Sequence, residues 1–136
     1  MALELVVVTP QGEAFSGPVE EVVLPGVEGE FGVLESHERF LSVLAHGCME
    51  IRTGEGSRFS AVSDGFAEVT GERVVVMVDS LVEAENIDFE ETRAEQQRAE
   101  AELESLAPGD ENATRRAELR DALDRANAQL AVAEKR

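Results

Sequence analysis

The chain has 136 residues, about the size of one ordinary domain, and its 12 basic and 29 acidic side chains give a formal net charge of −17. So acidic a surface repels nucleic-acid phosphates and anionic lipid headgroups, and neither is expected as a partner. The single cysteine, Cys48, excludes an intrachain disulfide framework, and no aliphatic run approaches the roughly 20 residues of a membrane span. The N-terminus has no basic region or cleavage site of a signal peptide, so a soluble, cytosolic protein is expected.

The negative charge is unevenly distributed along the chain. Residues 1–86 carry 4 basic and 16 acidic side chains, whereas residues 87–136 carry 8 and 13. This difference coincides with a change in composition, which predicts two domains divided between residues 86 and 87.

The first part reads as short strands separated by turns. β-Branched and apolar runs recur at roughly 8–12-residue spacing, and no run is followed by a helical pattern of 10–15 residues, so an all-β sandwich is predicted. The expected strands cover residues 3–8, 19–24, 31–34, 40–44, 48–53, 58–62, 66–69 and 74–78. The break before the second of them is Ser16-Gly17-Pro18.

After residue 87 the chain is rich in Ala, Glu, Arg and Gln, which predicts an antiparallel hairpin of two helices, about 88–106 and 111–135. Pro108 ends the first helix, and Asp110 or Asn112 is expected to cap the second through a side-chain oxygen. Heptad-like apolar positions suit packing against one neighbouring helix. They are Leu119, Leu123, Ala126, Leu130 and Ala133 on the second helix, and Ala99, Leu103 and Leu106 on the first.

Little apolar surface is available to hold this hairpin. Residues 87–136 contain eleven Ala but only five Leu. Five buried leucines contribute on the order of 10 kcal/mol at most, whereas ordering the backbone of this segment costs tens of kcal/mol. The hairpin is therefore expected to dock on another surface, in more than one way, and to be mobile.

No set of residues points to catalysis. His37 lies next to Glu38 and near Glu35, but no nucleophile with an orienting partner adjoins it, and no Cys/His spacing suggests a metal site. The favoured interpretation of His37 and its neighbours is a plain surface loop, and contact with a partner is the next. No catalytic residue, metal or cofactor is expected from these residues, and Cys48 reads as a small buried apolar side chain.

Basic side chains alternate with acidic ones along the hairpin. The arginines are Arg93, Arg98, Arg115, Arg116, Arg120 and Arg125. They are typical of a solvated helical surface stabilised by i,i+4 pairs. The alternative is an arginine-bearing face that meets an acidic partner, in which the charges steer association.

The segments 16–26, 28–34, 62–69 and 74–79, together with His37, resemble the N-terminal domain of the epsilon subunit of bacterial F-type ATP synthases. The segments 116–119 and 130–134 are similar to the final helix of that family. The order and the spacing match over nearly the whole chain.

The resemblance implies a β-sandwich followed by a helical hairpin, in a non-catalytic subunit of an ATP-synthesising, proton-transporting complex. It implies a central-stalk rotor subunit that binds the gamma subunit and the ring of c subunits, peripheral to the cytoplasmic face of the bacterial inner (plasma) membrane without inserting into it. Glu30 and His37 match loop positions that face the ring, although Glu35-Ser36 stand where the family usually has Pro-Gly.

The resemblance also implies conformational control by the hairpin. The hairpin either folds against the sandwich or extends along gamma toward the alpha/beta catalytic head, where it restrains ATP hydrolysis. The acidic face of the beta subunits then meets the basic contact residues, which are Arg115, Arg116, Arg120 and Arg125.

Two alternatives remain open. One is an ATP-sensing module, because family members that bind ATP on the hairpin carry Ile/Leu-Asp-x-x-Arg-Ala, and here Glu90 and Arg93 restore part of that spacing while Arg125 fits on the final helix. Gln129 stands where a second arginine would be, and a triphosphate needs clustered cations. The other is an unrelated β-sandwich adaptor with a helical interaction tail.

Overall fold

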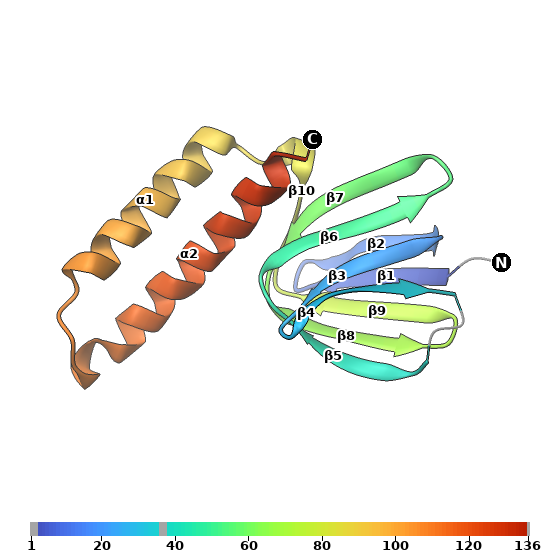
Figure 1. Cartoon of the computed structure of the whole chain (residues 1–136), viewed down its shortest axis with the longest axis horizontal. Coiled ribbons are helices and arrows are strands. Elements are labelled where there is room, and N and C mark those ends of the chain that lie inside the picture. The colour runs from blue at the N-terminus through green and yellow to red at the C-terminus, as the bar shows by residue number, and fades with distance from the viewer. Residues whose placement is uncertain (1–2, 36–37, 136) are drawn as a thin grey trace.

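Alternating apolar and polar side chains in the first part of the chain form ten short strands in the computed structural model, which describes residues 3–35 and 38–135. The strands are β1 (Leu3–Thr9), β2 (Gly12–Val19), β3 (Glu21–Gly26), β4 (Gly29–Leu34), β5 (Phe40–Leu44), β6 (Gly47–Thr53), β7 (Gly56–Val62), β8 (Gly65–Thr70), β9 (Arg73–Val78) and β10 (Leu81–Glu83). The predicted all-β sandwich is confirmed, and the helical hairpin lies beside one end of it (Figure 1).

The strands follow one continuous path that folds into two layers. Their order is β10-β7-β6-β3-β5-β8-β9-β1-β2, with β4 paired to β3 alone. All pairs are antiparallel except β1 with β9. The layers meet at β3, which pairs with β6 through residues 21–23 and with β5 through Gly26.

The main core lies between the two layers. Every second side chain of a strand points inward, so the core is made of alternate strand residues. Its largest fully buried members are Leu3, Leu5, Leu24, Leu44 and Met49, and every residue of this core belongs to the sandwich.

Two strands were not predicted from the sequence. Gly12–Val19 forms β2, so Ser16-Gly17-Pro18 is part of a strand and not the break that the sequence suggests. Pro18 lacks an N–H but is tolerated because β2 is the edge strand, where it pairs only with β1. The other is β10, with three residues too short for a local pattern.

The hairpin consists of α1 (Phe89–Ser105) and α2 (Ala113–Ala133), within about two residues of the predicted ends. Two short 3₁₀ turns, η1 (Ala84–Asn86) and η2 (Asp110–Asn112), precede them. The Asp88 side chain caps α1 by accepting a hydrogen bond from the Glu91 N–H.

The predicted cap of α2 is wrong. Asn112 occupies the N-cap position but makes no side-chain capping bond, and η2 takes up Asp110 as part of its own turn. The Asn112 amide donates instead to the Ala107 carbonyl at 2.8 Å, closing the loop between the helices.

Candidate interaction surfaces

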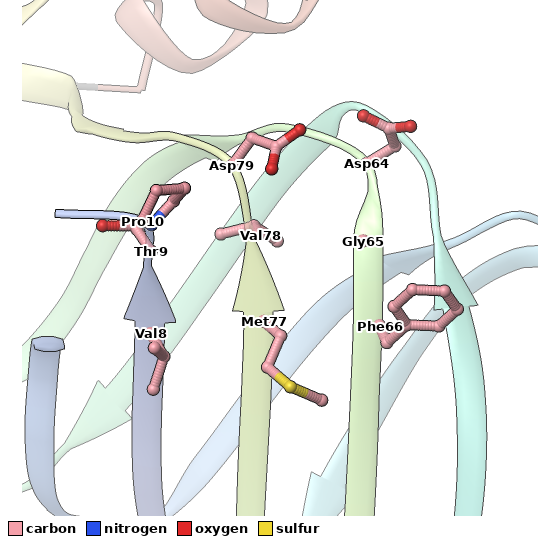
Figure 2. A pocket seen from close by; sticks show the side chains of 9 residues that line it. All are labelled: Val8, Thr9, Pro10, Asp64, Gly65, Phe66, Met77, Val78 and Asp79. Atoms are coloured by element: carbon pink, nitrogen blue, oxygen red, sulfur yellow. The ribbon is translucent and has the colours of Figure 1, made fainter. Parts of the chain in front are cut away.

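Four adjacent strands carry a row of apolar side chains on the outer face of the sandwich. The strand registers place Val8 beside Met77, Met77 beside Phe66, and Phe66 beside Val43. These four residues, the apolar row, are 36–50% exposed. Figure 2 shows Val8, Met77 and Phe66 on neighbouring strands. Contiguous exposed apolar surface of this kind marks a docking site in soluble proteins.

Acidic side chains border the apolar row. Glu68 is exposed and lies between Val75 and Leu41 in the next row of the same face. At the ends of the strands, Asp64 and Asp79 line the same shallow groove as Phe66 and Met77 (Figure 2). A partner that covers this face would match it best with apolar side chains flanked by basic ones.

A second groove lies at the β3–β4 turn, which carries the predicted contact residue Glu30. Glu30 is exposed, and Gly29 reverses the chain with a φ of 132°, a conformation that glycine tolerates best. Phe31 and Phe40 meet edge to face at 5.5 Å in the wall of this groove. The other predicted loop contact, His37, lies outside the described residues.

The base of the hairpin docks on the sandwich through a small second core. Val132 and Ala133 of α2 pack with Ala61, Ala84 and Ile87. Lys135 also places its ammonium 5.3 Å from the centre of the Phe59 ring. Three of the five buried residues are alanines, and the larger side chains that pack against them, such as Phe59 and Phe89, are only partly buried.

The two helices of the hairpin meet through both apolar and polar contacts. Leu119, Ala126 and Ala133 of the predicted stripe are buried, whereas Leu123 and Leu130 are half-buried. Polar pairs cross the seam as well. They are Thr92 with Gln129 at 3.3 Å and Gln96 with Asn127 at 2.7 Å. Such bonds fix the register of the helices but add little net stability.

Three of the four predicted basic contact residues have partners within the chain. Arg115 donates two hydrogen bonds to the Glu102 carboxylate, at 2.6 and 2.9 Å, and Arg116 donates to the Ala107 carbonyl at 3.2 Å. The Arg115 guanidinium lowers the pKa of the Glu102 carboxyl from its usual range. Arg120 is exposed on α2. The Arg115–Glu102 pair thus joins α2 to α1.

The candidate ATP residues are not joined to one another in the described part of the chain. Glu90 and Arg93 are exposed near the start of α1, whereas Arg125 donates to Asp121 on α2 at 3.1 Å. Thr92 and Gln129 occupy the seam between these positions.

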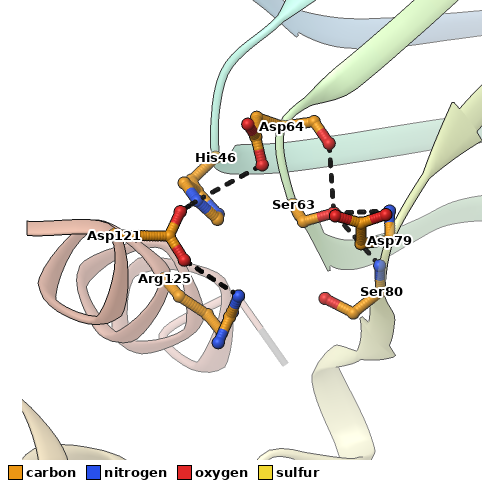
Figure 3. A network of polar contacts seen from close by, with 7 residues as sticks. All are labelled: His46, Ser63, Asp64, Asp79, Ser80, Asp121 and Arg125. Carbon is orange, nitrogen blue, oxygen red and sulfur yellow. Dashed lines mark hydrogen bonds and ion pairs between the residues drawn. The ribbon is translucent and has the colours of Figure 1, made fainter. Parts of the chain in front are cut away.

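A polar contact that the sequence did not suggest joins the sandwich to α2. His46, in the loop between β5 and β6, places its Nε2 atom 2.7 Å from Asp121 Oδ1 and 3.6 Å from Asp64 Oδ1 (Figure 3). His46 is separated from Asp121 by 75 residues in the chain, which is why no local pattern predicts it. The apolar row was missed as well, although apolar residues on both faces of β1 were a visible signal.

Within the described ranges, neither helix combines the length and the apolar character needed to cross a bilayer.

Comparison with known proteins agrees with this architecture. Residues 2–84 match the family model described as the ATP synthase delta/epsilon chain, beta-sandwich domain. The ATP synthase epsilon chain of Helicobacter acinonychis is 42% identical over 77% of this chain and 89% of its own length. That of Desulfosudis oleivorans is 45% identical over 76% of this chain and 78% of its own length.

Two solved structures resemble the whole chain. A chain in the Euglena gracilis mitochondrial ATP synthase structure, titled OSCP/F1/c-ring, has a TM-score of 0.82 and 26% identity over 96% of this chain and 80% of that chain. A chain from the central stalk/c-ring of the Tetrahymena thermophila enzyme, with a TM-score of 0.58 and 18% identity, shows the shared fold alone. The chain therefore belongs to the family of ATP synthase epsilon subunits.

Proposed function

We propose that this chain is a non-catalytic rotor subunit of a proton-translocating ATP synthase, and that it binds the gamma subunit through the apolar row. The observation that supports this most directly is the row itself, because it is the exposed apolar surface that adjoins both Glu68 and the Asp64–Asp79 groove. A subunit that turns with its neighbour needs a face that buries apolar area and fixes orientation by charge.

The β3–β4 turn suits a different neighbour. Glu30 is exposed on this turn, beside a groove lined by aromatic rings. We assign this end of the sandwich to the polar loops of the c-ring, which would place the subunit at the cytoplasmic face of a bacterial plasma membrane, attached only through its partners.

The hairpin supplies the proposed regulation. Three of the five buried residues in its docking interface are alanines, and the folded state and an extended state toward the alpha/beta head would differ by only a few kcal/mol. In the extended state the arginines of α2 would exchange their internal partners for acidic groups of the catalytic head.

Substitution of Phe66 tests the gamma interface. Phe66→Glu adds a buried charge to the centre of the proposed contact, and the fraction of gamma captured by the tagged chain should fall about tenfold or more. Leu34→Glu is the matched control, because Leu34 is similarly exposed but lies on β4, outside the apolar row. Undiminished capture of gamma by Phe66→Glu would show that gamma binds another face.

A further inference from the structure

His46, Asp64 and Asp121 form a cluster of metal-ligating groups that the proposed rotor function does not use. They come from three separate places: the β5–β6 loop, the β7–β8 loop and the middle of α2. One ligand atom of each lies within 4.8 Å of the other two. Figure 3 shows the imidazole between the two carboxylates.

The geometry points to a divalent metal site, and we propose that these three residues bind Zn²⁺ and thereby clamp the hairpin to the sandwich. Zinc bonds to imidazole nitrogen and carboxylate oxygen at about 2.0–2.2 Å, so neighbouring ligand atoms in a tetrahedral site lie about 3.3 Å apart. The observed separations from His46 Nε2 are 3.6 Å to Asp64 and 2.7 Å to Asp121, so these two distances must change by about 0.3 and 0.6 Å to reach that value.

The sandwich holds two of the ligands in place before any ion arrives. Buried Ser63 accepts hydrogen bonds from the Asp79 and Ser80 N–H groups, at 2.8 and 3.0 Å, and donates to the Asp64 carbonyl. On the other loop, the Ala45 N–H donates to the Pro25 carbonyl at 2.8 Å. Rigid loops reduce the entropy that the site loses when a metal binds.

The surroundings of Asp121, the third ligand, also suit metal binding. Arg125 bonds to Asp121 Oδ2, which leaves Oδ1 directed at His46 and orients the carboxylate from behind, as partners of metal ligands commonly do. The carboxylate side chains are 63% and 45% exposed for Asp64 and Asp121, so water has access to the remaining coordination position.

One feature limits the affinity. A metal on Nε2 leaves the proton of His46 on Nδ1, and Nδ1 is buried with no hydrogen-bond partner among the described residues. Metal-bound histidines usually donate this N–H to a carbonyl or carboxylate. Binding should therefore be weaker than in a structural zinc site, and reversible.

Because Asp121 lies on the hairpin, metal binding depends on the position of the hairpin. Two ligands belong to the sandwich and one to the hairpin, so all three meet only while the hairpin is folded down. An ion that binds one state and not the other stabilises that state by mass action. Zinc would therefore shift the hairpin toward the folded-down state.

The test is a titration of the purified full chain with Co²⁺, whose visible absorption intensifies when water ligands are replaced in a site of low coordination number. Zn²⁺ should abolish that absorption by displacement. Asp64→Asn and His46→Gln should each weaken binding about tenfold or more, because each removes one of three protein ligands. Asp79→Asn, with the same charge change on a neighbouring loop outside the cluster, should bind as the original chain does.

Proteolysis provides a second measurement that is independent of spectroscopy. Zn²⁺ should slow tryptic cleavage of the hairpin in the original chain and in Asp79→Asn, but not in Asp64→Asn. Co²⁺ absorption that stays that of the hydrated ion, or equal binding by all three variants, would overturn the proposal. Neither result depends on gamma, so this test and that of the rotor function fail separately.

Discussion

Gly65 shows how one residue sets the distance between two strands. It begins β8 opposite Val78 of β9, and a Cβ atom at this position would lie 2.0 Å from the Met77 carbonyl oxygen. That oxygen belongs to the backbone, so no side-chain rotation relieves the overlap. Gly65 therefore keeps β8 and β9 close together next to Phe66 and Met77 of the apolar row.

Gly65→Ala should accordingly destabilise the sandwich by about 2–3 kcal/mol, because the strand pair must separate to admit a methyl group. Urea unfolding followed by circular dichroism measures this change. Gly17→Ala is the control, since its nearest new contact is the Phe15 ring at an ordinary 3.9 Å, and it should change stability by less than about 0.5 kcal/mol. Equal stabilities of the two variants would contradict the close approach.

At the scale of elements, Cys48 reports on whether the hairpin is docked. The thiol packs against the second core that α2 completes. Burial raises the pKa of Cys48, while nearby Lys135 opposes this and Glu30 and Glu50 add to it. The neutral thiol of Cys48 is therefore favoured in the folded chain. Its contribution to the free energy of unfolding is complete at a pH below the pKa of the unfolded chain and is lost as the pH rises through the folded-state pKa. Alkylation at neutral pH should be slow and should accelerate in alkali.

Undocking the hairpin should expose the thiol. Val132→Asp puts a carboxylate into the fully buried position of the second core, and Cys48 should then react with iodoacetamide about tenfold faster or more. Ala131→Asp is the matched control, because the neighbouring side chain on the same helix is exposed. Mass spectrometry gives the rates. Identical rates for both variants would mean that docking of α2 does not protect Cys48.

The elements also show what a sequence can and cannot predict. The uninterrupted β-branched run Val74–Val78 and the periodic stripe through Leu119 and Ala126 are both local patterns, so most strands and both helices were predictable. The edge strand β2 was not predicted, because its sequence mixes Gly, Pro and polar residues. The interaction surfaces depend on pairings between distant segments, such as parallel β1 with β9, and local patterns do not contain that information.

At the scale of the whole molecule, the sandwich and the hairpin are stabilised by different cores. The main core draws every residue from the sandwich, whereas the second core is shared between sandwich and hairpin. The charge follows the same division, with most of the acidic excess in residues 1–86. The sandwich should therefore keep its fold and its apolar row when the hairpin moves or is absent.

Deletion of residues 87–136 tests this separation within the assembled enzyme. Capture of gamma should be unchanged, because the apolar row lies on strands whose core the deletion leaves intact. If the hairpin restrains the enzyme, ATP hydrolysis should rise about fivefold or more, the lower range of typical coupling between sites. The Phe66→Glu chain is the control for assembly, since it should lose gamma while retaining its hairpin. Unchanged hydrolysis by a complex that has incorporated the shortened chain would show that the hairpin is not a brake, and loss of gamma would show that the sandwich depends on the hairpin after all.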